Sequence, residues 1–333
     1  MGRSPCEGIG NAKSSVWGLS FSLSFYTLYL KYSIYFRTVF FMNSIPPLQP
    51  TAIGFSLANA HALVQAAGLA YHPPNEVTAQ ALAWGFRHCK LLDSGPTQGY
   101  VMANERAIVV SFRGTQGKDL RDWITNLDFD RIKTPNGMVH CGFNKAVDRV
   151  FEDLLLAVIK FRTQGQALFL TGHSLGGALA TLATLRLVNA GQSVAGLYTF
   201  GSPRVGDRTY FDRFNTALGQ GLNTELDAAP IDRAFRIVND EDIVPKLPFK
   251  ATGYCHVGEK YRFDTQGCLC LNPVPLEGLM AAIQDEIEDL LEPDWEVIND
   301  HYLGSYKTVI LANLLQSIAL VPALVPALVP ALV

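Results

Sequence analysis

Leu168–Ala180 constrains the fold more than any other stretch, because it reads Leu-Phe-Leu-Thr-Gly-His-Ser-Leu-Gly-Gly-Ala-Leu-Ala. An apolar run typical of a buried strand leads into Gly172-His-Ser-Leu-Gly176, and small helix-forming residues follow. Such a Gly-x-Ser-x-Gly turn between a strand and a helix exposes the serine hydroxyl at the edge of a sheet. The glycines let the strand and the helix pass closely. Ser174 is therefore predicted to be a nucleophile, the alternative being a plain turn before an ordinary helix.

Composition limits the other classes of function. A chain of 333 residues that is 48% hydrophobic can bury a large core, as one large domain or two small ones. Its formal net charge is −3 without a basic run, which argues against a nucleic-acid partner. Six cysteines in so long a chain do not form a disulfide framework, and free buried thiols are the simplest interpretation. A disulfide or a metal cluster among Cys255, Cys268, Cys270 and His256 is an alternative, although the spacing matches no standard zinc pattern.

The first segment, residues 1–50, differs from the rest of the chain. Val16–Phe41 is apolar and aromatic, but Lys31 and Arg37 interrupt it. Three interpretations stay open: an uncleaved membrane anchor, an atypical export signal, or translated upstream sequence with the true start at Met42. The first two predict a membrane-associated or secreted protein, and the third predicts a cytoplasmic one.

Residues 51–320 alternate between strand and helix patterns. The predicted strands are Phe86–Asp93, Tyr100–Asn104, Arg106–Phe112, Ala167–Thr171, Gly196–Phe200 and Ala234–Val238. The predicted helices are Phe55–Tyr71, Phe143–Phe161, Leu175–Ala190, Tyr210–Leu218, Glu277–Leu291 and Tyr306–Leu320. This alternation predicts an α/β fold with a mostly parallel, doubly wound sheet. In the tail, 321–333, a Val-Pro-Ala-Leu repeat is expected to prevent a continuous helix.

A serine nucleophile requires a general base and an acid that orients the base. In a fold of this kind the acid and then the histidine follow the serine along the chain. The strand that ends at Val238 leads into Asp240, Glu241 and Asp242. Loops at this end of a parallel sheet present site residues. Asp242 is the preferred acid, because the Ile-Val-Pro after it would dock inward, whereas the other two are typical of a solvated loop.

Two histidines follow the serine, His256 and His301, and chain order admits either as the base. Position alone favours His301 only mildly. His173, within the turn itself, is predicted to pack or to form hydrogen bonds locally.

The oxyanion of an acyl-transfer reaction requires two donors. The first is expected to be the backbone N–H of Leu175, the residue after the nucleophile. Thr115, in the turn after strand Arg106–Phe112, is the candidate for the second, and a plain strand-to-helix loop is an equal alternative. The mixed apolar and charged stretch Gln116–Gly137 suits a mobile flap or, equally, a surface helix that packs Trp123 inward.

With these residues assembled, the chain from about Phe55 to about Ala319 resembles the class 3 lipases, the fungal-lipase-like branch of the α/β-hydrolases. The motifs that carry the resemblance are Ser111-Phe-Arg-Gly-Thr115 with Asp122-Trp123, Val139-His-Cys-Gly-Phe143, Thr171-Gly-His-Ser-Leu-Gly-Gly177, Phe200-Gly-Ser-Pro-Arg-Val-Gly206, Asn239-Asp-Glu-Asp-Ile-Val-Pro245 and His301 in Asp-His-Tyr. The resemblance implies an α/β-hydrolase fold with helices on both faces of the sheet. It also implies Ser174 as nucleophile, Asp242 as acid and His301, rather than His256, as base. It further implies an oxyanion hole at Thr115 and Leu175 and a lid within Gln116–Leu127.

The reaction expected from this set is hydrolysis of a carboxylic ester through an acyl-enzyme, without a metal or an organic cofactor. An acylglycerol is the first expected substrate, and contact with a membrane or lipid interface is an expectation that follows from it. Phospholipase A1, galactolipase and short-chain carboxylesterase activities use the same triad and remain alternatives. A lipid-binding relative without activity is the alternative outside enzymes.

Overall fold

The computed structural model describes residues 45, 47–52, 54–116, 120–126, 128–219, 233–239, 242–270 and 301–328. All of them belong to one unit, Ile45–Val333. The three interpretations of the first segment, the acids Asp240 and Glu241, and the predicted helix Glu277–Leu291 lie outside the described residues.

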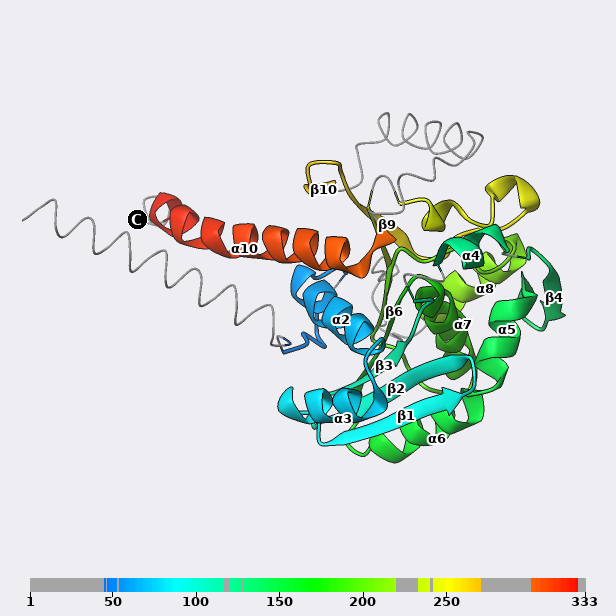
Figure 1. Ribbon diagram of the computed structural model, residues 1–333. Helices are drawn as coiled ribbons and strands as arrows, with labels where there is room; N and C mark the ends of the chain where they lie inside the picture. The colour runs from blue at the N-terminus through cyan, green and yellow to red at the C-terminus, as the bar shows by residue number, and fades with distance from the viewer. Residues whose placement is uncertain are drawn as a thin grey trace, which may run out of the picture. The chain divides into compact units, whose positions relative to one another are not determined.

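Within these ranges, an eight-stranded sheet with the order β1-β2-β3-β6-β7-β8-β9-β10 forms the centre of the fold (Figure 1). Its strands are β1 His88–Ser94, β2 Thr97–Ala103, β3 Ala107–Phe112, β6 Ala167–His173, β7 Gly196–Phe200, β8 Ala234–Asn239, β9 Glu259–Phe263 and β10 Leu269–Cys270. From β3 through β9 neighbouring strands pair in parallel, and the pairs at both edges are antiparallel. The predicted α/β class with a mostly parallel sheet is confirmed.

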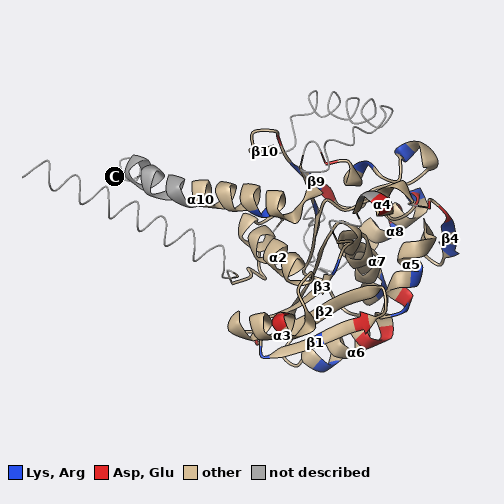
Figure 2. Ribbon diagram, viewed as in Figure 1, with Lys and Arg blue, Asp and Glu red and all other residues tan. Residues whose placement is uncertain are grey.

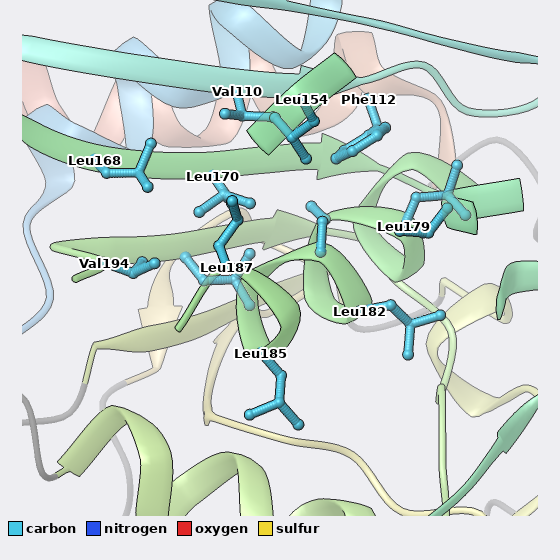
Figure 3. Packing of buried hydrophobic residues seen from close by; sticks show 14 of the residues in the cluster. Val110, Phe112, Leu154, Leu168, Leu170, Leu179, Leu182, Leu185, Leu187 and Val194 are labelled. Carbon is cyan, nitrogen blue, oxygen red and sulfur yellow. The ribbon is translucent and has the colours of Figure 1, made fainter. Parts of the chain in front are cut away.

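Helices cover both faces of this sheet. Those on one face are α2 Leu57–Leu69, α3 Pro74–Ala83 and α10 Leu303–Leu328, and those on the other are α5 Cys141–Asp148, α6 Phe151–Phe161, α7 Leu175–Asn189 and α8 Arg208–Gly219. Strand side chains alternate between the two cores, as the period of two requires. Val110 and Leu170, for example, face Leu154 and the leucines of α7 (Figure 3), whereas Val109 joins the core beneath α2.

The helix α2 differs in composition from α6 on the opposite face. It contains no charged residue (Figure 2), and eleven of its residues are buried, because α10 and the sheet cover it. The exposed face of α6 carries Glu152 and Asp153 in its first turn and Lys160 in its last. A helix buried on all sides is expected to lack charged residues, and a surface helix to be amphipathic.

The helices differ from the prediction at three places. The single helix predicted over Phe143–Phe161 is divided into α5 and α6, because Val150 leaves the helical conformation and the acidic first turn of α6 stabilises a new N-terminus. The helix α3 has no predicted counterpart. The prediction that prolines prevent a helix after Leu320 was wrong: α10 continues to Leu328, although each proline removes an N–H donor and crowds the carbonyl four residues earlier. The alanines and leucines between the prolines favour a helix.

Four strands were not predicted. β9 and β10 extend the sheet, while β4 Arg131–Thr134 and β5 Gly137–His140 form a separate two-stranded sheet. Across the described part of the chain, no helix combines the length and the apolarity needed to span a membrane.

The described cysteines are free, as predicted from the sequence, but they are less buried than predicted. Cys89, Cys141, Cys255, Cys268 and Cys270 are all free thiols, as predicted. Cys268 is exposed and the others are half-buried, so the expectation that they are buried was wrong. No group of residues suited to hold a metal ion occurs within the described ranges.

Candidate active site

Ser174 lies in the turn between β6 and α7, at the carboxyl edge of the sheet. Its φ of 59° is the one positive value at a non-glycine residue in the described chain. This conformation is strained for a residue with a side chain, and strain of this kind is typical of functional turns. The serine N–H donates to the Phe200 carbonyl oxygen at 2.9 Å, which fixes the turn to β7. The predicted strand–turn–helix geometry is present.

The glycines around Ser174 are required by close backbone contacts. A Cβ on Gly172 would lie 2.3 Å from the Gly176 carbonyl carbon and oxygen, and a Cβ on Gly176 would lie 2.3 Å from the Phe112 carbonyl oxygen. These are backbone atoms, which cannot move away from an added Cβ as the end of a flexible side chain can. The sequence therefore places glycine where the start of α7 crosses β6 and β3.

Asp242 and His301 form a buried pair. The Nδ1 atom of His301 is 2.9 Å from Oδ1 and 2.8 Å from Oδ2 of Asp242. The Val244 N–H donates to Oδ1 at 2.9 Å, and the Tyr306 hydroxyl donates to Oδ2 at 2.5 Å. A carboxylate is an acceptor only, so Nδ1 of His301 carries a proton, and in the neutral imidazole the lone pair is then on Nε2.

Two side-chain atoms at this site have no hydrogen-bond partner among the described residues. They are Oγ of Ser174 and Nε2 of His301, and both are buried. Unpartnered buried polar atoms are uncommon, and a catalytic role is one explanation for them. Three predicted candidates thus gather at the carboxyl ends of β6 and β8 and the start of α10, where an open α/β sheet presents its site.

Tyr306 and Gly201 belong to the same site, although neither was predicted. The Tyr306 hydroxyl also accepts from the Asn239 N–H at 3.2 Å, so this phenol joins α10 to the end of β8. Gly201, directly after β7, has a φ of +56° and lies against both members of the Asp242–His301 pair. The glycine in the Phe200–Gly206 motif was a sequence signal for Gly201. Tyr306 had no such signal, because only the tertiary fold brings it to Asp242.

His256 occupies a different position from His301. Its Nε2 atom lies 2.7 Å from the Pro245 carbonyl oxygen. Burial, and then the guanidinium groups of Arg236 and Arg204, hold the pKa of His256 well below its usual range. Neutral His256 therefore donates a hydrogen bond from Nε2 to the Pro245 carbonyl oxygen. This contact stabilises the loop that follows Asp242.

The two residues predicted as oxyanion donors lie in turns next to the serine turn or within it. Leu175 is the first residue of α7, and Thr115 follows Gly114 in the turn after β3. A Cβ on Gly114 would lie 2.5 Å from the His173 carbonyl oxygen and 3.2 Å from Cβ of Ser174. The turn that contains Thr115 therefore passes directly against the serine turn.

The stretch predicted to contain a lid includes a short helix, α4 Leu120–Thr125. Leu120 and Ile124 are buried against Ile243, Val244 and Leu247, the residues just after Asp242. Trp123 stacks on Phe143, with ring centroids 6.4 Å apart and an interplanar angle of 20°. The tryptophan thus packs inward, in agreement with one of the two expectations for this stretch.

His173 forms hydrogen bonds with residues far away in the chain, whereas local contacts were predicted. Its Nε2 atom is 2.6 Å from the carbonyl oxygen of His301, 128 residues away, and its Nδ1 atom is 2.9 Å from the Tyr71 hydroxyl. The His173 and His301 rings are 4.6 Å apart between centroids. Because His173 directly precedes Ser174, this contact places the His301 ring beside the serine turn.

Replacing Gly201 by alanine is expected to damage this site sterically. The added Cβ would lie 2.6 Å from Oδ2 of Asp242 and 3.0 Å from Nδ1 and Cε1 of His301. The ester hydrolysis expected from the sequence should fall about 100-fold in this variant, since a displacement of order 1 Å at a reacting group has that effect. Gly191→Ala is the matched control, because Gly191 has a φ of +78° with open space around it. Equal kcat/KM values for the two variants would contradict the expectation.

A nucleophile turn of this geometry on a mostly parallel sheet defines an α/β-hydrolase. Residues 109–252 match the family model for lipase (class 3). Over 218 residues the chain is 31% identical to triacylglycerol lipase OBL1 of Arabidopsis thaliana, an alignment that covers 51% of this chain and 40% of that protein. It is 34% identical over 167 residues to a lipase of Rhizomucor miehei, covering 47% of this chain and 42% of that one.

One solved triacylglycerol lipase, described as having a serine protease triad as its catalytic centre, aligns with a TM-score of 0.51 at 26% identity. The alignment covers 64% of this chain and 82% of that structure. The chain spans less than half the length of the two curated relatives above. Residues 109–252 are thus similar to the class 3 lipases, and the resemblance predicted from the motifs is confirmed.

Proposed function

We propose that this protein is a serine-dependent carboxylic ester hydrolase, and most directly an acylglycerol lipase. The observation that carries the proposal is the buried Asp242–His301 pair, with Nδ1 and Oδ2 2.8 Å apart beside the strained serine turn. The relatives' descriptions as triacylglycerol lipase and lipase support the same substrate class. We assign the catalytic domain to residues 51–320.

In the proposed mechanism, Oγ of Ser174 attacks the ester carbonyl while Nε2 of His301 removes its proton. Asp242 stabilises the imidazolium that results, and the Tyr306 hydroxyl and the Val244 N–H hold the carboxylate in position. The imidazolium then protonates the leaving alcohol. A water molecule activated by the same histidine hydrolyses the acyl-enzyme.

The tetrahedral oxyanion is assigned to the N–H of Leu175 and to Thr115. Leu175 begins α7, a helix of 15 residues, and the positive end of the helix dipole favours negative charge at this point. Removal of one oxyanion donor in enzymes of this kind costs roughly 100- to 1000-fold in rate. Electrostatic stabilisation of the oxyanion is thus expected to add to the effect of the nucleophile and the base.

The substrate is assigned a path to the buried site that opens when α4 moves. Ser174 and Asp242 are 0% exposed and His301 is 1% exposed, so an ester cannot reach them in this conformation. The apolar side of α4 packs on Ile243, Val244 and Leu247. Movement of α4 would expose both apolar surfaces, which a lipid interface can cover.

The test is hydrolysis of acylglycerols and simple esters of short and long chains, below and above the solubility limit of each. We expect turnover of long-chain acylglycerols and a rise in rate above that limit. A preference for phospholipids or galactolipids would change the assigned head group, and activity on soluble short-chain esters alone would make the protein a carboxylesterase. Absence of both turnover and labelling by a fluorophosphonate would contradict the proposal and favour a lipid-binding relative.

A further inference from the structure

Tyr71 and His173 form a hydrogen-bonded pair that the proposed triad does not include. Tyr71 lies just after α2, and His173 is the last residue of β6, directly before the nucleophile. The phenol oxygen is 2.9 Å from Nδ1 of His173, whose Nε2 is 2.6 Å from the His301 carbonyl oxygen. The pair therefore connects one face of the fold with the main chain of the proposed base.

The direction of each hydrogen bond follows from the chemistry of the groups. A carbonyl oxygen only accepts, so Nε2 of His173 carries a proton and donates to His301. Burial, and then the neighbouring His301 and Lys307, hold the pKa of His173 well below its usual range. Neutral His173 has one N–H, and its Nδ1 atom must accept the proton of the Tyr71 hydroxyl.

The oxygen of Tyr71 also lies against the oxyanion side of the site. A Cβ on Gly114 would lie 2.3 Å from this oxygen, so the Gly114 backbone packs directly on the phenol. Gly114 immediately precedes Thr115, one of the two assigned oxyanion donors. One phenol and one imidazole thus connect the oxyanion turn, the nucleophile turn and the base.

We propose that Tyr71 and His173 are positioning residues that set His301 and the Gly114–Thr115 turn relative to Ser174. This role rests on the proposed ester hydrolase function. His301 lies two residues before Leu303, the first residue of α10, so the hydrogen bonds of that helix do not define its backbone. Asp242 binds the side chain of His301, and His173 binds its main-chain carbonyl oxygen. The contact with His173 fixes the position of the imidazole ring relative to the Asp242 carboxylate.

The energetic effect should appear in kcat rather than in substrate binding. Hydrogen bonds arranged head to tail in a buried chain reinforce one another, and removal of one member loosens both ends. Displacement of a general base by about 1 Å costs on the order of 100-fold in rate. Neither side chain touches a reacting atom in this assignment, so KM is expected to change little.

The experiment compares His173→Leu, His173→Gln and Tyr71→Phe in the full chain. Gln retains an N–H that can donate to the His301 carbonyl, whereas Leu retains only bulk. We expect His173→Leu to lower kcat about 100-fold, Tyr71→Phe about 10-fold and His173→Gln no more than about 5-fold, with KM within about 2-fold in each. Tyr210→Phe is the matched control, because the Tyr210 hydroxyl is buried and donates to the Thr181 carbonyl oxygen away from the site.

A spectroscopic measurement tests the positioning role without substrate. The Nδ1 proton of His301, held on the Asp242 carboxylate, should give a far-downfield proton resonance in the wild type. We expect it to shift or broaden in His173→Leu and Tyr71→Phe and to persist in Tyr210→Phe and His173→Gln. A structural role alone would lower the melting temperature and leave both this resonance and the kcat of the folded fraction unchanged.

The outcomes separate this inference from the proposed function. If the wild type hydrolyses no ester and is not labelled by a fluorophosphonate, the proposed function fails, and the resonance still reports whether His173 and Tyr71 position His301. Unchanged kcat and an unchanged resonance in Tyr71→Phe would overturn the inference. Equal loss of kcat in His173→Gln and His173→Leu would overturn it as well. If His173→Leu does not fold, the Gln and Phe variants decide the question.

Discussion

Ser174→Ala is expected to lower ester hydrolysis by about four to six orders of magnitude while the fold persists. The hydroxyl has no hydrogen-bond partner among the described residues, so its removal leaves no other group unsatisfied. The turn keeps its geometry, because the surrounding glycines and the bond from the Ser174 N–H to Phe200 do not involve the side chain. Initial rates on an acylglycerol, together with circular dichroism and a melting curve, measure both effects.

Ser111→Ala is the matched control for this prediction. Ser111 is also fully buried, and its hydroxyl donates to the Ala66 carbonyl oxygen at 3.2 Å on the side of the sheet covered by α2. Its loss should cost about 1 kcal/mol of stability and leave turnover near that of the wild type. Near-normal hydrolysis by Ser174→Ala would refute the proposed mechanism outright.

The second large effect is expected from the two downstream histidines, replaced one at a time. His301→Ala removes the only nitrogen base assigned to the serine and leaves the buried Asp242 carboxylate without its imidazole partner. We expect a loss of about three to five orders of magnitude in kcat. His256→Ala removes a hydrogen bond to the Pro245 carbonyl, which should cost about 1–2 kcal/mol of stability and no more than about 10-fold in rate.

The same pair of variants can be compared by labelling with a fluorophosphonate. Covalent attack on phosphorus also requires an activated serine, so His301→Ala should react far more slowly than the wild type and His256→Ala at a similar rate. Thermal melting of both variants controls for misfolding. The opposite order of activities would reassign the general base to His256 and remove Asp242–His301 from the mechanism.

Features encoded by contiguous residues were predictable from the sequence. The apolar run of β6, the glycines around Ser174 and the small residues of α7 follow one another, so periodicity and turn chemistry were enough to predict the strand, turn and helix. The α/β class followed from repetition of such units. The residues before and after Val150 share one amphipathic pattern, so the sequence predicted a single helix. The break between α5 and α6 was therefore missed.

The sequence also indicated the candidates for the site but left the choice between histidines open when residues alone were considered. Asp242 and His301 are 59 residues apart, and His173 and His301 are 128 apart, so no local pattern reports whether they meet. The resemblance to a family favoured His301. The structure adds the distance of 2.8 Å to Asp242 and gives His256 a different partner.

By itself, the sequence determined the class of fold, the strained serine turn and the chain order of the candidate acid and base, because each depends on short-range geometry or on order along the chain. Only the tertiary structure decided that Tyr306 contacts the Asp242 carboxylate, that Gly201 leaves room for the Asp242–His301 pair, and that Tyr71 and His173 lie between His301 and Gly114. These contacts act over less than 4 Å between residues far apart in the chain. Their formation depends on how the helices on both faces pack on the sheet, and packing of that kind leaves no periodic signal in the sequence.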